Sequence, residues 1–364
     1  MKNINLKGIT KQYKSVVAVK NLNLEVKEGE LFCLLGPSGC GKTTTLRMIA
    51  GFIPPTNGEI YIGDKNVTNL LPNKRDIGMV FQDYALFPHM SVANNVAFGL
   101  RMRKFDKKKI AEKVNRYLKI VGLESQKNQL PRFLSGGEQQ RIAMIRAVII
   151  EPSILLCDEP LSNLDAKLRK QMRFEIKRIQ QKFGITTIFV THDQEEALTI
   201  ADRIGVMKDG AIEQSGVPEE IYNSPKNRFV ADFIGISNFF KGDIITESNV
   251  CFLMISDKIK IKLGKAEENI CKNEKAEIVI RPERINIIKN IEQLGSSPQG
   301  RKDNVFHGKV GRVSRLGSVI ECMVEMEGCQ DVIVHYHETN KNLSLKENDS
   351  VFLMWKPEDC KIIS

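Results

Sequence analysis

Three short stretches of the chain are continuously apolar rather than alternating: residues 31–36 (LFCLLG), 154–157 (ILLC) and 186–190 (TTIFV). A strand buried on both faces of a parallel sheet has this pattern, because helices cover it from both sides. Between these stretches, residues 107–121 and 166–183 place apolar side chains at the three- and four-residue spacing of an amphipathic helix. Alternating strand and helix signals predict an α/β domain with a parallel sheet.

The pattern changes after about residue 236. Short segments that partly alternate apolar and polar residues follow one another, separated by Gly, Asn, Asp and Pro. This arrangement is typical of a small all-β domain, either a sandwich or a barrel. Residues 290–304 are polar and rich in turn formers, so they predict a loop within that domain. We therefore expect two domains, at residues 1–235 and 236–364.

The length and the charge agree with this division. A chain of 364 residues suffices for about two domains of roughly 100–200 residues each. The net charge is +10, and residues 236–364 carry 19 basic and 19 acidic side chains, so the whole excess lies in residues 1–235. That excess could serve phosphate ligands, nucleic acid or a partner at a membrane, or it could be an ordinary basic surface.

Neither a membrane span nor an export signal is expected. No apolar run approaches the roughly 18 residues that span a bilayer, and the first residues, MKNINLKGIT, contain no apolar segment of signal-peptide length. The eight cysteines form no CxxC pair, which argues against a disulfide framework or a zinc site. Reduced thiols in the cytoplasm fit these observations.

Residues 36–43, GPSGCGKT, match the phosphate-binding pattern G-x-x-x-x-G-K-[ST]. The segment follows an apolar run and leads into a helical sequence, which is the strand–loop–helix context that the motif requires. Its glycines allow backbone N–H groups to surround an anion, and the helix N-terminus adds the positive end of its dipole. Lys42 is expected to reach the β- and γ-phosphates of a nucleotide, and the Thr43 hydroxyl to bind Mg²⁺.

Two adjacent carboxylates, Asp158 and Glu159, follow the apolar run at 154–157. Ligands of open α/β sheets bind at the carboxyl ends of the strands, and a buried strand that ends in two acids is unfavourable without a cation nearby. We expect Asp158 to contribute to the Mg²⁺ site and Glu159 to accept a proton from an attacking water. The alternative is a strand end that turns polar as it enters a loop.

A second pair of glycines stands at 136 and 137, within LSGGEQQR. Ser135 and Glu138 alone would be explained as a capping box that opens a helix. The capping box does not explain Gly136 and Gly137, which would let a ligand approach the backbone closely at a helix N-terminus. We therefore expect a second phosphate-binding helix N-terminus in this segment.

These motifs, in this order and spacing, resemble those of the ATP-binding-cassette (ABC) ATPases: GPSGCGKT, LSGGEQQR, ILLCDEP, SNLD at 162–165, and the lone histidine in VTHDQEEAL. The resemblance extends to about residue 235 and implies a P-loop ATPase fold with a parallel-sheet core and a helical subdomain, which binds ATP and Mg²⁺. It also implies a head-to-tail dimer of two copies, in which each ATP lies between the P-loop of one chain and residues 135–137 of the other.

The resemblance assigns roles to individual positions. Gln82 matches the glutamine that contacts Mg²⁺ and the attacking water, and His192 matches a histidine that contacts the γ-phosphate. Tyr13 matches the aromatic residue on which adenine stacks, and Asp165 matches the aspartate that crosses between subunits. The expected site comprises the catalytic residues Gln82, Glu159 and His192, the metal ligands Thr43, Gln82 and Asp158, and the nucleotide-binding residues Tyr13, Gly36, Pro37, Ser38, Gly39, Cys40, Gly41, Lys42, Thr43, Thr44, Ser135, Gly136, Gly137 and Asp165.

The β-rich tail resembles the oligonucleotide-binding-like (OB-like) accessory domain of importer ATPases, through VIRPERINII at 279–288 and LMWKPEDCKII at 353–363. A metal-binding pair at His335 and His337, which alternate along one strand, is an alternative reading of that segment, although no third ligand is nearby. The cassette pattern has one departure, Glu138, where the family more often has Gln.

Two classes of cassette protein remain open. One is the ATPase subunit of a membrane importer, which works with permease subunits at the cytoplasmic face of the membrane and, indirectly, with an extracytoplasmic substrate-binding protein. The other is a soluble cassette protein that acts on ribosomes or nucleic acid. Soluble cassette proteins usually carry two cassettes or a long coiled coil before the signature motif, and the 90 residues between Thr43 and Leu134 leave no room for one. We therefore expect an importer subunit and no nucleic-acid partner.

The transported substrate is indicated less sharply. The segment from residue 193 to residue 242 looks most like the polyamine (spermidine/putrescine) importer ATPases. Ferric-iron, phosphonate and sugar importers share much of this segment, so those substrates remain alternatives.

Overall fold

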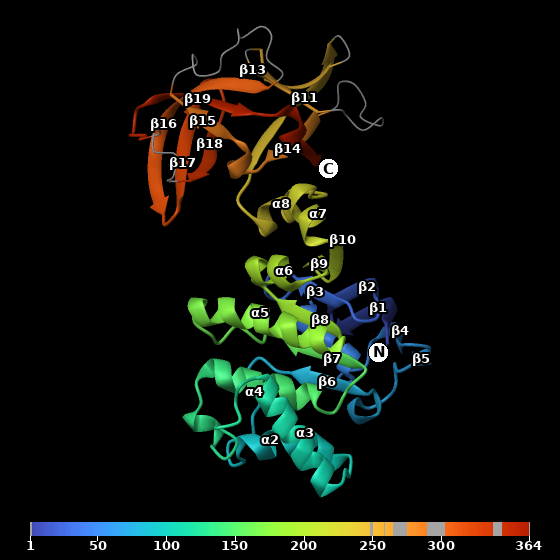
Figure 1. Cartoon of the computed structure of the whole chain (residues 1–364). Coiled ribbons are helices and arrows are strands. Elements are labelled where there is room, and N and C mark those ends of the chain that lie inside the picture. Colours follow the sequence, from blue (N-terminus) through green and yellow to red (C-terminus); the bar gives the residue numbers. More distant parts are fainter. Residues whose placement is uncertain are drawn as a thin grey trace. The chain divides into compact units, whose positions relative to one another are not determined.

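The structure is a computed structural model that describes residues 2–247, 250–257, 259–264, 275–289, 303–337 and 344–363. The chain divides into two compact units between Ile221 and Tyr222 (Figure 1). Cys271 and most of the loop expected at 290–304 lie outside the described residues.

The first unit is built on a six-stranded sheet in the order β10-β9-β3-β8-β7-β6. The three apolar stretches of the sequence are its neighbouring strands β3, β8 and β7, which run parallel and are buried along their whole length. The α/β prediction is confirmed, because continuous apolar strands occupy the centre of the sheet. Its strands are β3 (Leu31–Leu35), β6 (Ile77–Val80), β7 (Ile154–Asp158), β8 (Thr186–Thr191), β9 (Arg203–Lys208) and the antiparallel edge strand β10 (Ala211–Gly216).

The first unit also contains a four-stranded antiparallel sheet, in the order β2-β1-β4-β5, which the hydrophobic pattern did not reveal. Register shifts interrupt the pairing of β1 with both of its neighbours. The apolar positions therefore do not alternate regularly enough to predict a strand. Apolar side chains of β1, β2 and β4 share one hydrophobic core with α1 and the central strands. The strands are β1 (Ile4–Tyr13), β2 (Val16–Val26), β4 (Asn57–Ile62) and β5 (Lys65–Asn66).

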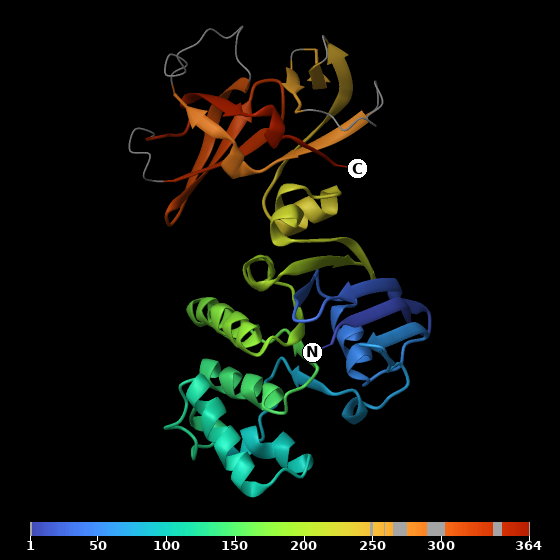
Figure 2. The same ribbon diagram turned by 45° about the vertical axis from the view of Figure 1, so that its right-hand side comes forward.

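Helices accompany the central sheet, and α2, α3 and α4 gather into a separate helical subdomain away from the antiparallel sheet (Figures 1 and 2). The helices expected at 107–121 and 166–183 are α3 and α5, each opened by an aspartate that caps the first turn. The helices of this unit are α1 (Lys42–Ala50), α2 (Val92–Met102), α3 (Lys107–Ile120), α4 (Gly136–Val148), α5 (Ala166–Phe183) and α6 (Gln194–Ile200), and α7 (Pro218–Asn223) spans the division.

The second unit contains two five-stranded antiparallel sheets, in the orders β13-β12-β11-β14-β20 and β15-β19-β16-β17-β18. Their inner faces share one core around Trp355, whose ring lies 5.0 Å from that of Phe306 and 6.2 Å from that of Phe240. The expected all-β domain is confirmed. Its strands are β11 (Asn238–Glu247), β12 (Val250–Ser256), β13 (Ile259–Lys262), β14 (Lys275–Ile280), β15 (Asn286–Ile288), β16 (Asn304–Leu316), β17 (Val319–Met326), β18 (Asp331–His337), β19 (Ser350–Trp355) and β20 (Lys361–Ile363).

The division between the units lies earlier than the change of pattern near residue 235 indicated. Helix α8 (Arg228–Ile234) buries Ala231 against β14 and β20. The guanidinium of Arg281 donates hydrogen bonds to the carbonyl oxygens of Tyr222, Ala231 and Gly235. These contacts attach the segment to the second unit. The amino-acid composition changes only where the β strands begin, so it did not show that the helices before them belong to the same unit.

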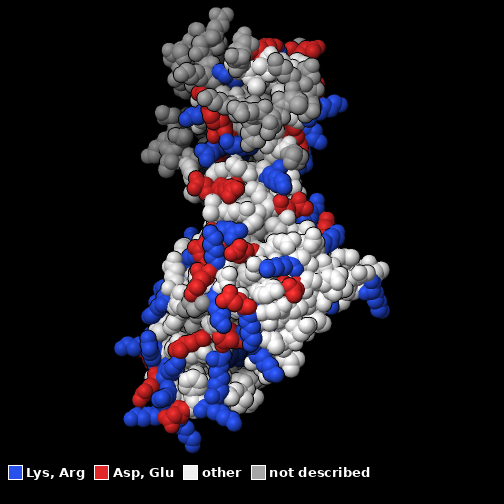
Figure 3. Space-filling view, turned by 90° about the vertical axis from the view of Figure 1, so that its right-hand side faces the viewer, with Lys and Arg blue, Asp and Glu red and all other residues white. Residues whose placement is uncertain are grey.

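The surface charge, the hydropathy of the helices and the candidate metal ligands bear on the expectations from the sequence. One face, shown in Figure 3, has basic and acidic side chains interspersed over the lower part of the view, which is the first unit. Within the described residues, no helix is long and apolar enough to cross a membrane. The same residues contain no cluster of three or more His, Cys, Asp or Glu that could hold a metal ion, and His335 instead lies 3.1 Å from Glu321 on the neighbouring strand.

Candidate active site

The loop between β3 and α1 closes around a lysine side chain. β3 ends at Leu35 and α1 begins at Lys42, with residues 36–41 between them. The ammonium of Lys42 is buried and donates hydrogen bonds to the carbonyl oxygens of Gly36, at 2.7 Å, and Pro37, at 2.9 Å. The loop backbone therefore wraps a fixed positive charge at the carboxyl end of the central strand.

The start of α1 has no side-chain cap of its own. Gly41 occupies the N-cap position with a φ of 107°, and a Cβ there would lie 2.4 Å from the carbonyl oxygen of Ala18. The first N–H groups of a helix need external acceptors when no side chain supplies one. Together with the buried Lys42, these N–H groups make this end of α1 suited to an anion.

The remaining loop positions differ in exposure. Ser38 and Gly39 are exposed and Thr44 is half-buried, so a ligand can reach this part of the loop. Cys40 is buried, and its burial raises the pKa of the thiol, although Lys42 lies 3.8 Å from the sulfur. Cys40 therefore behaves as a small apolar filler of the loop.

A hydroxyl and a carboxylate meet where α1 faces β7. The Thr43 hydroxyl donates a hydrogen bond of 3.0 Å to Oδ1 of Asp158, the last residue of β7. Asp158 is 8% exposed, and burial raises the pKa of its carboxyl group, while the hydrogen bond from Thr43 and the charge of Arg47 act in the opposite direction. A buried carboxylate held beside a hydroxyl is a natural pair of oxygen ligands for a hard cation.

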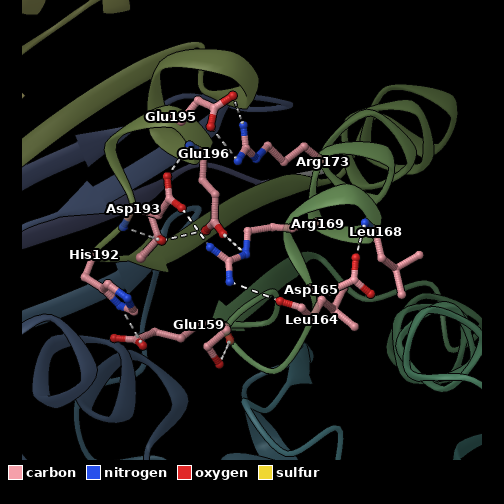
Figure 4. Close-up of polar contacts among 12 residues, drawn as sticks. Glu159, Leu164, Asp165, Leu168, Arg169, Arg173, His192, Asp193, Glu195 and Glu196 are labelled. Carbon is pink, nitrogen blue, oxygen red and sulfur yellow. Dashed lines mark hydrogen bonds and ion pairs between the residues drawn. The ribbon is translucent and has the colours of Figure 1, made fainter. Parts of the chain in front are cut away.

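Glu159 and His192 lie side by side at the ends of neighbouring parallel strands. Nδ1 of His192 is 3.0 Å from Oε2 of Glu159 (Figure 4). The backbone N–H of Glu159 donates to the carbonyl oxygen of Val190 in β8, and Glu159 has a φ of 43°. A non-glycine residue in this left-handed region is strained, and such residues gather at functional sites.

Gln82 comes to the same edge of the sheet through the segment that contains SNLD. The side-chain amide of Asn163 donates a hydrogen bond of 2.9 Å to the carbonyl oxygen of Gln82, and Gln82 itself is exposed. Tyr13 stands apart from these contacts at the end of β1, where the residue is 46% exposed and Nζ of Lys11 lies 5.0 Å from the ring centre.

The start of α4 is capped by side chains of its own first turn. Ser135 is the N-cap, and its hydroxyl and backbone N–H both donate to Oε2 of Glu138, at 2.7 and 2.8 Å, while the Ser135 hydroxyl accepts from the Glu138 N–H. The hydrogen bonds from Ser135 lower the pKa of Glu138. The capping box expected from the sequence is therefore present, and a glutamate carboxylate stands at the positive end of the helix.

The paired glycines of α4 face the start of α5. A Cβ on Gly137 would lie 2.8 Å from a methyl carbon of Leu168, and one on Gly136 would lie 3.0 Å from a methyl carbon of Leu164. Close packing is thus a reason for these glycines that the sequence did not indicate. Asp165, between the two leucines, caps α5 by accepting a hydrogen bond from the N–H of Leu168.

The expected site residues therefore form two groups within one chain. The P-loop, Asp158, Glu159 and His192 converge at the carboxyl edge of the central sheet, and the backbone of Gln82 is tied to the neighbouring segment 162–165. Among the described residues, no hydrogen bond or ion pair joins residues 135–137 to residues 36–44.

Several residues that organise these segments were not singled out from the sequence. Arg146 of α4 donates to the carbonyl oxygens of Tyr84 and Ala85, and the buried Asn95 bonds the backbone of the same loop at several points. Arg169 of α5 connects two loops at the site. Arg146 and Arg169 lie on helices that the sequence predicts next to the motifs, whereas no sequence signal marked Asn95.

Comparison with known protein families identifies both parts of the chain. Residues 19–162 match the ABC transporter family, and residues 278–363 match the TOBE domain. The chain is 49% identical over 299 residues to a spermidine/putrescine import ATP-binding protein of Fusobacterium nucleatum, which covers 79% of this chain and 77% of the relative. It is also 42% identical over 372 residues to a protein of the same name from Thermobifida fusca, covering 99% of this chain and 93% of the relative.

A further relative and two solved structures complete the comparison. An Fe(3+) ions import ATP-binding protein of Fusobacterium nucleatum is 49% identical over 290 residues, covering 79% of this chain and 76% of that protein. A dimeric post-hydrolysis ATP-binding cassette, MJ0796, bound to ADP and Pi, is 36% identical with a TM-score of 0.53, and the match covers 59% of this chain and 98% of that one. CbiO1 from Clostridium perfringens, part of the cbiONQ transporter complex, is 30% identical with a TM-score of 0.56, covering 60% and 89% of the two chains.

Both the P-loop geometry and these similarities point the same way. The chain belongs to the ATP-binding ATPases of the ABC transporter family, and it carries a C-terminal TOBE domain.

Proposed function

We propose that this chain is the ATPase subunit of an ABC importer for polyamines, and that it works at the cytoplasmic face of the membrane with permease subunits and a substrate-binding protein. The observation that carries the proposal is the similarity to spermidine/putrescine import proteins along 99% of the chain, which includes the TOBE domain. The ferric-iron import relative is 49% identical but covers 79% of the chain, so iron is the second candidate substrate.

The P-loop and α1 bind the phosphates of ATP in this proposal. Lys42 and the uncapped N–H groups of α1 offer charge-assisted hydrogen bonds to the β- and γ-phosphates. The exposed residues Ser38 and Gly39 leave the loop open to solvent, so the phosphates can enter without unfolding it. The adenine ring stacks on the half-exposed face of Tyr13.

The oxygen ligands at the end of β7 fit a magnesium ion. The Thr43 hydroxyl and the buried Asp158 carboxylate already lie 3.0 Å apart, and the exposed Gln82 amide is available to join them. Magnesium supplies charge neutralisation for the phosphates when bound.

Glu159 acts as the general base and His192 orients it. The 3.0 Å contact between their side chains holds the Glu159 carboxylate in one position, and the strained backbone at Glu159 presents it beyond the end of β7. The carboxylate accepts the proton of the attacking water, while the ring of His192 stays close enough to contact the γ-phosphate.

The second half of each ATP site comes from another copy of the chain. Residues 135–137 and Asp165 have no hydrogen bond or ion pair with residues 36–44 of their own chain in the part that the structure describes. A partner that presents its own α4 start to the γ-phosphate would use the first backbone N–H groups of the helix, at Gly136 and Gly137. The dimeric state named for the similar cassette MJ0796 supports this arrangement.

The segment at residues 83–96, a loop that runs into the start of α2, is the proposed contact with the permease. Asn95 and Arg146 hold its backbone, and Tyr84 and Ala85 adopt φ values of 62° and 45°. A loop that is braced from α4 can transmit a movement between the nucleotide site and a partner. A cysteine at Ala85 or His89 is expected to crosslink to a cytoplasmic helix of the permease, and crosslinks formed only through the C-terminal unit would contradict this.

The chemical part of the proposal is tested by Glu159→Gln in the full-length chain. We expect hydrolysis to fall by about 10²–10⁴-fold, because proton acceptance is lost while the size of the side chain is kept. ATP binding should persist, and ATP should now hold two chains together in size-exclusion chromatography. Glu151→Gln, at an exposed ion pair with Lys113, is the control and should turn over normally. Unchanged hydrolysis in Glu159→Gln would assign the base elsewhere.

The transport part is tested with the assembled importer in vesicles. Binding protein loaded with spermidine or putrescine should stimulate ATP hydrolysis, and binding protein loaded with ferric iron should not. Stimulation by ferric iron alone would replace the polyamine assignment with the second candidate. Stimulation of the isolated chain by ribosomes or nucleic acid would overturn the importer assignment.

A further inference from the structure

Arg169, in the first turn of α5, reaches both loops that carry the reacting side chains. Its Nη2 donates a hydrogen bond of 3.0 Å to the carbonyl oxygen of Leu164, and its Nη1 lies 3.2 Å from Oδ2 of Asp193. Its Nε is 3.9 Å from Oε1 of Glu196. Figure 4 shows the guanidinium between the segment that ends at Asp165 and the turn that follows His192. One planar cation therefore joins a backbone carbonyl to two carboxylates.

The acidic side of this contact fixes the turn around His192. The Thr191 hydroxyl donates a hydrogen bond of 2.6 Å to Glu196 and accepts one of 3.0 Å from the backbone N–H of Asp193. Asp193 caps α6 by accepting from the N–H of Glu196. Glu196 is 2% exposed, and burial raises the pKa of its carboxyl group. The residues on either side of His192 are therefore held by bonds that converge on Arg169.

The other side of the contact fixes the loop that follows Glu159. Both the hydroxyl and the backbone N–H of Ser162 donate to the carbonyl oxygen of Glu159, at 3.0 and 3.3 Å. Leu164, whose carbonyl oxygen binds Arg169, directly precedes the capping residue Asp165. With the Glu159–His192 contact, these links close a ring through Arg169 around a cavity of about 30 Å³.

We propose that Arg169 is a positioning residue for ATP hydrolysis. It acts through Asp193 and Leu164 to keep the side chains of His192 and Glu159 in their positions relative to each other. The inference rests on the roles proposed above for these two residues. Without the guanidinium, the buried Glu196 loses its nearest cation and the carbonyl of Leu164 loses its donor, so both loops are free to shift. A shift of about 1 Å at reacting groups lowers turnover by up to about 100-fold.

Arg173 provides a control, because it lies one helical turn further along α5 and is also an arginine in an ion pair. Its side chain is buried, whereas that of Arg169 is half-buried. Nη1 and Nη2 of Arg173 lie 2.8 and 3.0 Å from the carboxylate oxygens of Glu195, whose side chain is 70% exposed. This pair lies outside the ring, as Figure 4 also shows. Loss of Arg173 should therefore loosen the packing of α5 without displacing His192.

The test compares Arg169→Gln with Arg173→Gln in the purified full-length chain, by steady-state ATP hydrolysis, nucleotide binding and thermal denaturation. Arg169→Gln should lower kcat by about 10- to 100-fold while KM and ATP affinity change by less than about twofold. Arg173→Gln should keep kcat within about twofold of the unmodified chain, even with a lower melting temperature. Arg169→Lys should recover part of kcat, because a point charge can pair with Asp193 but cannot bridge to Leu164 as well.

A double-mutant cycle under single-turnover conditions separates positioning from general loosening. If Arg169 acts through His192, Arg169→Gln should lower the rate little further in a His192→Ala background. Fully additive losses, or an equal loss of kcat in Arg173→Gln, would overturn the inference. Normal turnover in Arg169→Gln beside an inactive Glu159→Gln would overturn it too, while leaving the proposed function intact. Normal turnover in Glu159→Gln would instead refute the proposed function.

Discussion

Two helices of the ATPase unit, α1 and α4, both begin next to glycine, yet their first turns are satisfied in different ways. At α1 the N-cap is Gly41, which has no side chain to bond the first N–H groups, and the ammonium of Lys42 is buried beneath the loop. At α4 the N-cap Ser135 and Glu138 bond each other. The start of α1 is therefore suited to bind an external anion, whereas a carboxylate of the same chain already lies at the start of α4.

In the proposed function, this difference separates a helix start that binds ATP alone from one that does not. The dipole of α1 and the charge of Lys42 add in the same direction, so a phosphate is attracted without help. At α4 the Glu138 carboxylate already interacts with the positive helix end, which leaves the N–H groups of Gly136 and Gly137 as weak donors. In the proposed dimer, a site of that kind contributes only when another chain delivers the phosphate.

The largest expected effect comes from removing the charge at α1. Lys42→Ala should abolish nucleotide binding or reduce hydrolysis to background, because the Lys42 ammonium is the cation enclosed by the loop backbone. The fold should survive, since the neighbouring strands and α1 share a large apolar core. Nucleotide titration and circular dichroism check the two halves of the statement. A folded variant with normal turnover would contradict the assignment of the P-loop.

The next largest effect tests whether α1 and α4 contribute differently to ATP binding. Ser135→Arg should spare binding of ATP to the single chain but abolish dimer formation and turnover, because α4 would contribute only in the dimer. Binding to the single chain is measured by equilibrium titration, and dimer formation by light scattering with ATP. Mixing this variant with Lys42→Ala should restore at most one composite site. Loss of ATP binding by the single chain would mean that one chain builds the whole site.

A smaller effect distinguishes the two reasons for Gly137. The Cβ of Gly137→Ala meets the end of the half-buried Leu168 side chain, which can move, so stability should change by less than about 1 kcal/mol. Turnover should fall by about tenfold or more if the glycine admits a phosphate. The double variant Gly137→Ala, Leu168→Ala removes the packing conflict. Recovery of turnover in the double variant would show that packing alone requires the glycine.

The smallest effect concerns the carboxylate at α4. Hydrogen bonds from Ser135 lower the pKa of Glu138, so its ionised form stabilises the folded chain above the ordinary glutamate pKa of about 4.3. That contribution is lost as the pH falls through the lowered pKa. Glu138→Gln keeps the capping box, so stability at pH 7 should change by less than about 0.5 kcal/mol. Melting temperatures measured at pH 7 and below pH 4 should show a weaker acid dependence in the variant.

Much of the fold could be predicted because its signals are local. The buried strands β3, β7 and β8 appear as continuous apolar runs, and α3 and α5 as periodic segments opened by Asp106 and Asp165. The antiparallel sheet of β1, β2 and β4 escaped prediction, because register shifts break its alternation. The segment after Ile221 escaped as well, since Arg281, far along the chain, decides where it packs.

Short stretches of sequence suffice to predict the motifs and their chemistry: a P-loop after a buried strand, two carboxylates at the end of another buried strand, and a capping box at Ser135 and Glu138. Short-range backbone geometry specifies such features, so a few adjacent residues suffice to predict them. The contact of Glu159 with His192, and the link that Arg169 makes between the loops behind them, come from tertiary packing. These contacts link segments that lie far apart in the chain or on separate elements, and their geometry depends on the packing of α5 and on the pairing of β7 with β8.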